Sequence, residues 1–242
     1  MKLYIAGIES HINIVQIERP KFVLFSYAHH NAGCLEYIKS IHCKDYIMDS
    51  GAFTFMNGGK QIDFIEYARS YAEYVRDNNI EKYIELDLYN VIGVEETEEI
   101  RKLLFQITGR KPIPVFHKSL GLDYFIALIE QFDYIAIGGI VTKHITNKDY
   151  KYFEYFIKLA HSNNCKVHGL GLTSQKNIAK YNFDSVDSTT WIRGRFGDIY
   201  YYDNGRMRTY KKKNSRLKDS TKANQFCLNQ WIKFQKYAEH NL

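Results

Sequence analysis

Three aspartates, Asp49, Asp87 and Asp187, stand at or near the ends of short apolar runs in the sequence. A single aspartate in such a place is commonly a turn residue or a helix N-cap. Three that converge on one site repel one another, so the site holds a proton or a cation, or divides into a nucleophile and an acid/base. The pattern therefore indicates either metal binding or glycosyl transfer.

Glycosyl transfer requires one carboxylate that attacks an anomeric carbon and a second that carries the proton of the leaving group. Asp187 and Asp49 are suitable residue types at suitable positions for these two roles. Four glycines near the ends of later apolar runs would let a flat ligand lie against the backbone, because they carry no Cβ: Gly138, Gly139, Gly169 and Gly171.

Metal binding would draw on histidines beside Asp87, namely His29, His30, His117 and His168. Adjacent side chains in an extended segment point to opposite sides, so His29 and His30 do not easily share one ion. The HxH pair of metal-dependent barrel hydrolases is also missing from the first apolar run, YIAGIES. We predict no metal site and expect His117 and His168 to contact substrate, with a metal-dependent hydrolase as an alternative.

Eight apolar runs, rich in β-branched and aromatic residues, are candidates to position these side chains. Their weak alternation is typical of parallel strands that helices cover on both faces. We predict strands over residues 3–8, 22–27, 46–50, 83–88, 113–117, 134–140, 166–172 and 185–189.

Amphipathic stretches separate the later runs, and we predict helices over residues 61–79, 95–109, 120–132, 148–164 and 175–181. Eight strands with intervening helices and no internal linker favour an α/β fold, a single (β/α)₈ TIM barrel over residues 1–242. A doubly wound open sheet is the alternative. Barrel enzymes carry their chemistry at the carboxyl ends of the strands, where the three aspartates would meet.

Basic residues concentrate in the segment 193–222, which carries ten Lys/Arg against three Asp, a net charge of +7 in a chain of net charge +6. This asymmetry is typical of a surface that binds a phosphate backbone, although a solvated face is an alternative. Trp191 and the tyrosines 200–202 are candidates to stack on unpaired bases, with a division of the tyrosines between core and surface as the alternative. The predicted phosphate-binding residues are Arg193, Arg195, Arg206, Arg208, Lys211, Lys212 and Lys213.

The remaining composition points to an ordinary cytoplasmic globular protein. Hydrophobic residues make up 45% of the chain, and it contains neither a long apolar run nor a signal-peptide pattern. The four cysteines form no CxxC pair, so we expect reduced thiols and no zinc knuckle.

Four motifs resemble the tRNA-guanine transglycosylases of the queuine and archaeosine type. MDSGAFTF (48–55) is similar to the DSGG-F signature of that family, and IAIGGI and HGLGLTS are similar to its glycine-rich segments. VDSTTWIRGRFGDIYYYDNGRM resembles its FD-x-x-x-PTR-x-AR-x-G block. The resemblance covers residues 45–210, with the motifs in the family's order.

The resemblance implies a role for each matching residue. Asp187 would be the nucleophile, Asp49 the general acid/base, and Asp87 the acceptor for the guanine N1 and N2 donors. Arg193 and Arg195 would hold phosphate. The other implied base-binding residues are Ser50, Gly51, His117, Gly138, Gly139, His168 and Gly169.

The departures from the family pattern concern the nucleic acid. The family's CxCxxC-plus-His zinc site is absent, so no cofactor is expected. The proline of PTR is replaced, with Thr190, Trp191 and Ile192 standing before Arg193, and His117 stands where the family commonly has glutamine. These features resemble the compact DNA-guanine transglycosylases, often phage-encoded, that insert 7-deazaguanines such as preQ0 into DNA.

The expected partners are therefore DNA and a 7-deazaguanine base, in the cytoplasm of the cell or of a phage host. Alternatives are a transglycosylase that acts on tRNA and a nucleic-acid-binding barrel without catalysis. The sequence leaves open a homodimer or a required partner protein.

Overall fold

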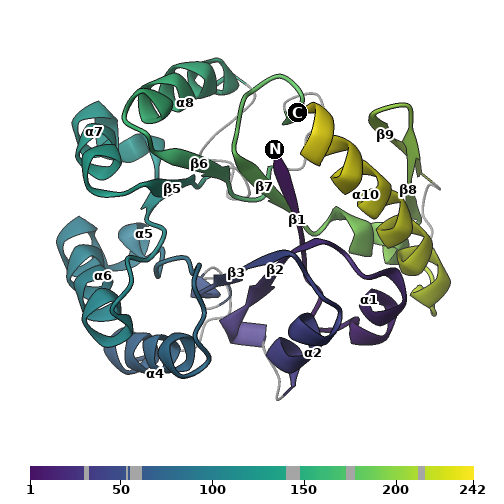
Figure 1. The fold of residues 1–242 in the computed structure, drawn as a ribbon, viewed down its shortest axis with the longest axis horizontal. Helices are drawn as coiled ribbons and strands as arrows, with labels where there is room; N and C mark the ends of the chain where they lie inside the picture. Colours follow the sequence, from purple (N-terminus) through teal and green to yellow (C-terminus); the bar gives the residue numbers. More distant parts are fainter. Residues whose placement is uncertain (30–32, 53, 55–61, 140–147, 173–177, 212–215) are drawn as a thin grey trace.

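Seven parallel strands form one curved sheet in the computed structural model of the protein, which describes residues 1–29, 33–52, 54, 62–139, 148–172, 178–211 and 216–242 (Figure 1). The strand order is β3-β2-β1-β7-β6-β5-β4, and each strand falls on one of the predicted apolar runs. The strands are β1 (Lys2–Ala6), β2 (Phe22–Ser26), β3 (Asp45–Asp49), β4 (Val115–Phe116), β5 (Tyr134–Ile137), β6 (Lys166–Gly169) and β7 (Ser185–Ser188).

The predicted closed eight-stranded barrel is corrected to a seven-stranded parallel half-barrel. The eighth predicted strand, residues 83–88, lies between the two edges of the sheet, but Tyr83 and Ile84 make only isolated parallel bridges to either side. The buried carboxylate of Glu85 accepts a hydrogen bond from the Val115 backbone N–H at 2.6 Å. A side chain thus takes the place that a backbone carbonyl would occupy in a continued ladder.

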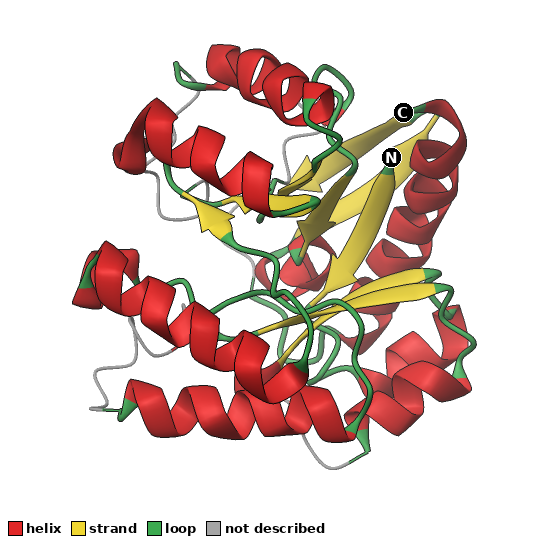
Figure 2. Ribbon diagram, turned by 60° about the vertical axis from the view of Figure 1, so that its left-hand side comes forward, coloured by secondary structure: helices red, strands yellow, loops and turns green. Residues whose placement is uncertain are grey.

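Helices surround the curved sheet on its outer side (Figures 1 and 2). The clearest predicted helix, 61–79, corresponds to α4, which begins after Asp63 because its carboxylate caps the N–H groups of Ile65 and Glu66. The predicted helix over 175–181 lies largely outside the described residues. The helices are α1 (Ile12–Glu18), α2 (Cys34–Ser40), α4 (Phe64–Asp77), α5 (Tyr89–Ile92), α6 (Val94–Thr108), α7 (Gly121–Gln131), α8 (Phe153–Ser162) and α10 (Thr221–Asn241).

Alternate residues of each strand face opposite sides of the sheet. On β1, Leu3 and Ile5 belong to the large core beneath the helices, whereas Tyr4 and Ala6 belong to a smaller cluster inside the half-barrel. On β3, Ile47 belongs to the inner cluster. By the same alternation, the side chains of Asp45 and Asp49, at the two ends of β3, also face the interior of the half-barrel.

The C-terminal part contains elements that the sequence reasoning did not anticipate. The short helix η4 (Thr190–Phe196) follows β7 and leads into an antiparallel hairpin, β8 (Asp198–Asp203) and β9 (Arg206–Lys211). Its turn, Asn204-Gly205, has positive φ at both residues, as an Asn-Gly hairpin turn requires.

Helix α10 then packs along β1, where the Gln235 amide donates to the carbonyl oxygens of Leu3 and Phe22. None of the described helices has the length and apolar character needed to cross a membrane.

Candidate active site

The carboxyl ends of the strands surround a cavity of about 370 Å³. Residues of β1, β2, β3, β4 and β7, and of the segments that follow the strands, form its wall. Most of the predicted catalytic and base-binding residues line it together: Asp49, Ser50, Asp87, His117, Gly138, Gly139 and Asp187.

Three predicted residues lie behind the wall instead. Gly51 has φ of +77°, and a Cβ there would lie 2.3 Å from the Cβ of Ala28, so Gly51 forms the turn after β3. A Cβ on Gly169 would meet the Phe183 ring at 3.2 Å, which indicates a packing role. His168 is fully buried.

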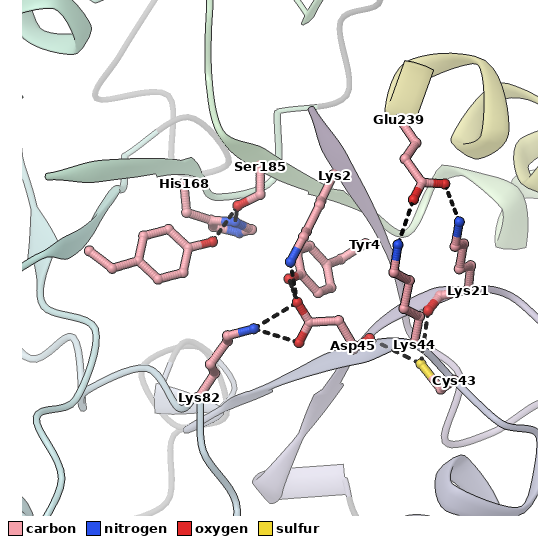
Figure 3. Close-up of polar contacts among 11 residues, drawn as sticks. Lys2, Tyr4, Lys21, Cys43, Lys44, Asp45, Lys82, His168, Ser185 and Glu239 are labelled. Atoms are coloured by element: carbon pink, nitrogen blue, oxygen red, sulfur yellow. Dashed lines mark hydrogen bonds and ion pairs between the residues drawn. The ribbon is translucent and has the colours of Figure 1, made fainter. Parts of the chain in front are cut away.

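Asp187 is held by hydrogen bonds from β6 and the segment that follows it. Its Oδ1 accepts the Gly171 N–H at 2.7 Å and lies 3.3 Å from His168 Nε2. The other ring nitrogen of His168 lies 2.6 Å from the Ser185 hydroxyl, which also contacts Tyr134 (Figure 3). His168 is thus fixed from both sides, and its position orients the Asp187 carboxylate toward the cavity.

Asp49 has a different environment from Asp187. Burial, as the largest cause, and the nearby carboxylates of Asp187, Glu9 and Asp87 together raise the pKa of Asp49 to about 7, against the opposing effect of a hydrogen bond from the Gly51 N–H. A carboxyl group with this pKa exchanges its proton near neutral pH, as a general acid/base must.

Asp87 and His117 form a pair on the opposite wall. His117 Nε2 lies 2.7 and 2.9 Å from the two carboxylate oxygens of Asp87. Gly138 makes room for the ring, since a Cβ at that position would lie 3.0 Å from His117 Cε1 and 2.7 Å from Val115 Cγ1. Both residues line the cavity, so the pair brings the acceptor oxygens of the Asp87 carboxylate to its wall.

Five polar residues of the wall were not predicted from the sequence: Glu9, Ser26, Thr54, Asn90 and Thr189. His29, which was considered only as a metal ligand, also lines the wall. Glu9 is 8% exposed, its carboxylate accepts the Ser26 backbone N–H, and burial raises its pKa. The buried Ser26 hydroxyl has no hydrogen-bond partner among the described residues. Glu9 directly follows the first apolar run, so the rule that selected Asp49 and Asp187 would also have selected Glu9.

The described part of the cavity wall carries four carboxylates, from Glu9, Asp49, Asp87 and Asp187, and no lysine or arginine. Within the described ranges, no group of three or more His, Cys, Asp or Glu side chains is arranged to hold a metal ion. The cavity is thus rich in hydrogen-bond acceptors and suits a ligand that is rich in donors.

The predicted phosphate-binding residues lie outside this cavity. Arg193 donates to Asp198 at 2.8 Å, Arg208 pairs with Asp203, and the Arg195 guanidinium lies 4.5 Å from the centre of the Phe196 ring. The other predicted residues within the described ranges, Arg206 and Lys211, lie exposed on β9, whereas Lys212 and Lys213 lie outside those ranges.

The predicted stacking role of Trp191 is wrong. Its ring is fully buried and its indole N–H donates to the Ala6 carbonyl at 2.8 Å, so it belongs to the core. Of the three tyrosines, Tyr200 is buried beside Trp231, and Tyr201 is the exposed one.

Comparison with known proteins identifies the fold alone. No protein family and no curated protein matches the sequence. Among solved structures, the chain is similar to a candidate fructose-1,6-bisphosphate aldolase from Coccidioides immitis, with a TM-score of 0.57 and 11% identity over 98% of this chain and 91% of that chain. The similarity supports a TIM-barrel-like α/β fold.

Proposed function

We propose that the protein is a guanine transglycosylase that exchanges guanine in DNA for a 7-deazaguanine such as preQ0. The observation that carries the proposal is the pairing of Asp187 with Asp49, a carboxyl of pKa about 7, in one cavity. Two carboxyl groups in such different environments suit a nucleophile and an acid/base. The motif order supports guanine as the leaving base.

In the first half-reaction, the Asp187 carboxylate attacks C1′ of the nucleotide while protonated Asp49 gives its proton to the departing guanine. The C1′–N9 bond breaks and an aspartyl ester to C1′ forms. The hydrogen bond from the Gly171 N–H fixes the attacking carboxylate, which supports a preorganised nucleophile.

In the second half-reaction, ionised Asp49 removes the N9 proton of the incoming 7-deazaguanine, and that nitrogen attacks C1′ and releases Asp187. One glycosidic bond replaces another, so the exchange needs no external energy source. The target nucleotide must be single-stranded or flipped out, because a stacked base does not reach an enclosed cavity.

Base recognition falls to the wall opposite Asp187. The Asp87 carboxylate suits the N1–H and N2–H donors of guanine, and its contact with His117 holds both side chains in place. The backbone at Gly138 and Gly139 leaves space for the purine edge.

Aldol cleavage of a sugar bisphosphate, suggested by the name of the structural neighbour, receives no support from the cavity. The four carboxylates would repel a bisphosphate, and the described wall offers no lysine or arginine to neutralise it. The acceptor-rich wall favours a neutral purine base over a sugar bisphosphate.

The test is incorporation of labelled guanine or preQ0 into DNA and, in parallel, into unmodified tRNA, by the wild type and by Asp187→Ala. We expect label in DNA with the wild type alone. Label in tRNA would assign the protein to tRNA modification, and label in neither would favour a binding protein without catalysis.

A further inference from the structure

We infer that a second cleft binds a backbone phosphate of the DNA strand whose nucleotide enters the cavity. We define this phosphate cleft by its lining residues, Arg195, Arg216, Leu217, Lys218 and Ser220, around a volume of about 390 Å³. The inference rests on the proposed function for the choice of DNA, and on the structure for the location.

Charge distinguishes the phosphate cleft from the rest of the basic segment. Three cationic side chains and one hydroxyl line it, and no carboxylate is among its described lining residues. The nearest acid in the sequence, Asp219, caps the Thr221 N–H instead. By contrast, Arg193 forms an ion pair with Asp198, and Arg208 forms one with Asp203. The cleft therefore concentrates positive charge that is available to an anion.

The phosphate cleft lies on the same rim as the cavity. Two contacts show that helix α10 runs antiparallel to β1. The Ala238 carbonyl near the end of the helix accepts a hydrogen bond from the N-terminal amine, and Asn224 in its first turn contacts His11, just after β1. Ser220, which lines the cleft, is the N-cap of this helix and contacts Asn224. The first turn of α10 thus meets the carboxyl ends of the strands, where the cavity opens.

A short rigid connection joins the two sites. Thr189 lines the cavity, and η4 carries the chain from there to Arg195, a path of about 12 Å at 2 Å per residue. The Leu217 N–H donates to the Arg195 carbonyl at 3.0 Å, which fixes the second side of the cleft against η4. This spacing suits a phosphate close to the nucleotide in the cavity.

An exposed aromatic ring adjoins the cleft. Phe196 is 42% exposed, and the guanidinium groups of Arg193 and Arg195 lie over its ring, 5.7 and 4.5 Å from the centre. Aromatic rings beside cations are typical of grooves that bind single strands, where bases stack and phosphates pair. A neighbouring unpaired base would stack here.

The test compares two double variants of equal charge change in a fluorescence anisotropy titration with a single-stranded DNA oligonucleotide. We expect Arg216→Ala/Lys218→Ala to weaken binding at least tenfold at low salt. The slope of log K against log salt should fall in magnitude by about 0.7, for the loss of one phosphate contact on a single strand. The matched control, Arg206→Ala/Arg208→Ala on the hairpin, should change the slope by less than half as much.

Several results would overturn the inference: a wild type that does not bind DNA at low salt, a cleft variant with unchanged slope, or a larger effect from the hairpin variant. A cleft-dependent slope with unmodified tRNA alone would overturn the choice of DNA. If circular dichroism finds the double variant unfolded, the single variant Lys218→Glu replaces it. The added carboxylate at this exposed position should repel the DNA phosphate. Binding is measured without any deazaguanine, so failure of base exchange leaves this result intact.

Discussion

Two aspartates of the same strand, Asp45 and Asp49, lie on the inner face of the half-barrel in opposite environments. Asp45, at the amino end of β3, receives hydrogen bonds from Lys2 and Lys82, as Figure 3 shows, and from the Tyr4 hydroxyl. Burial alone would raise the pKa of Asp45, but the two lysines lower it below its usual value. Asp49, at the carboxyl end, faces other carboxylates, and its pKa is about 7.

The difference separates the end of the sheet that is structural from the end that we propose to be reactive. At the amino end each charge has a partner, so the ionised carboxylate stabilises the fold. At the carboxyl end the charges are alike, so ionisation of Asp49 destabilises the fold, and the carboxyl keeps a transferable proton up to near neutral pH. Perturbed groups in a cavity are typical of active sites.

The largest effect should come from Asp49→Asn. We expect a base-exchange rate about 100- to 10,000-fold lower than that of the wild type, since the amide cannot transfer the proton. The folded-state pKa of about 7 exceeds the ordinary value of 3.8, so the wild type loses stability as the pH rises from about 4 to 7. The variant escapes this loss, and denaturant unfolding should find it more stable above pH 7, by about 4 kcal/mol at most.

That gain should be absent below about pH 4, where Asp49 is protonated in both folded and unfolded states. If Asp49→Asn is less stable than the wild type at pH 8, ionised Asp49 stabilises the fold as Asp45 does, which would contradict the account of Asp49.

An intermediate effect of opposite sign is expected for Asp45→Asn, which deprives Lys2 and Lys82 of their partner. Since both lysines are more than a third exposed at their side chains, the loss at pH 7 should be only about 1 to 2 kcal/mol. The folded-state pKa is lowered, so the loss should shrink as the pH falls below about 4.

Chemical denaturation at several pH values measures this loss, with Lys44→Ala as the control. Lys44 pairs with Glu239 at an exposed site, so its removal should cost about 0.5 kcal/mol or less. Base exchange by folded Asp45→Asn should proceed at the wild-type rate; a large loss of activity would place Asp45 in the reactive site.

The smallest effect should follow from Glu9→Gln. Glu9 is one of the carboxylates that raise the pKa of Asp49, so its neutralisation should lower that pKa. Titration of the ¹³C-labelled aspartate carboxyls by NMR measures the shift directly. An unchanged Asp49 pKa would show that Glu9 does not contribute to it.

The sequence predicted most of the strands because each is a short, apolar, β-branched run, a signal that does not depend on distant residues. The predicted strand over residues 83–88 was wrong although this run is also apolar. The Glu85 side chain contacts Val115 and Arg101 there, and a local sequence pattern does not encode such contacts between distant residues. The hairpin was detectable from Asn204-Gly205, but the basic composition of the segment obscured it.

The candidate site was predictable where residue type and strand end coincide, as at Asp49 and Asp187, which line one cavity. Burial was not predictable: Trp191 looked like a stacking platform beside the arginines, yet its ring lies in the core. The pairing of Arg193 with Asp198 was also hidden, because the helical turn of η4 and the start of β8 bring them together. Composition identified a basic segment, but it did not show which of its lysines and arginines already pair with a carboxylate and which are available to bind a phosphate.

The most direct test of the central claim is to trap the aspartyl ester. Wild-type protein is mixed with a guanine-containing single-stranded oligonucleotide, quenched in denaturant, digested and analysed by mass spectrometry, with Asp187→Asn as the control. The account predicts one covalent adduct, on the peptide that contains Asp187, and none with the variant. An adduct on Asp49, or none with wild-type protein that exchanges bases, would contradict it.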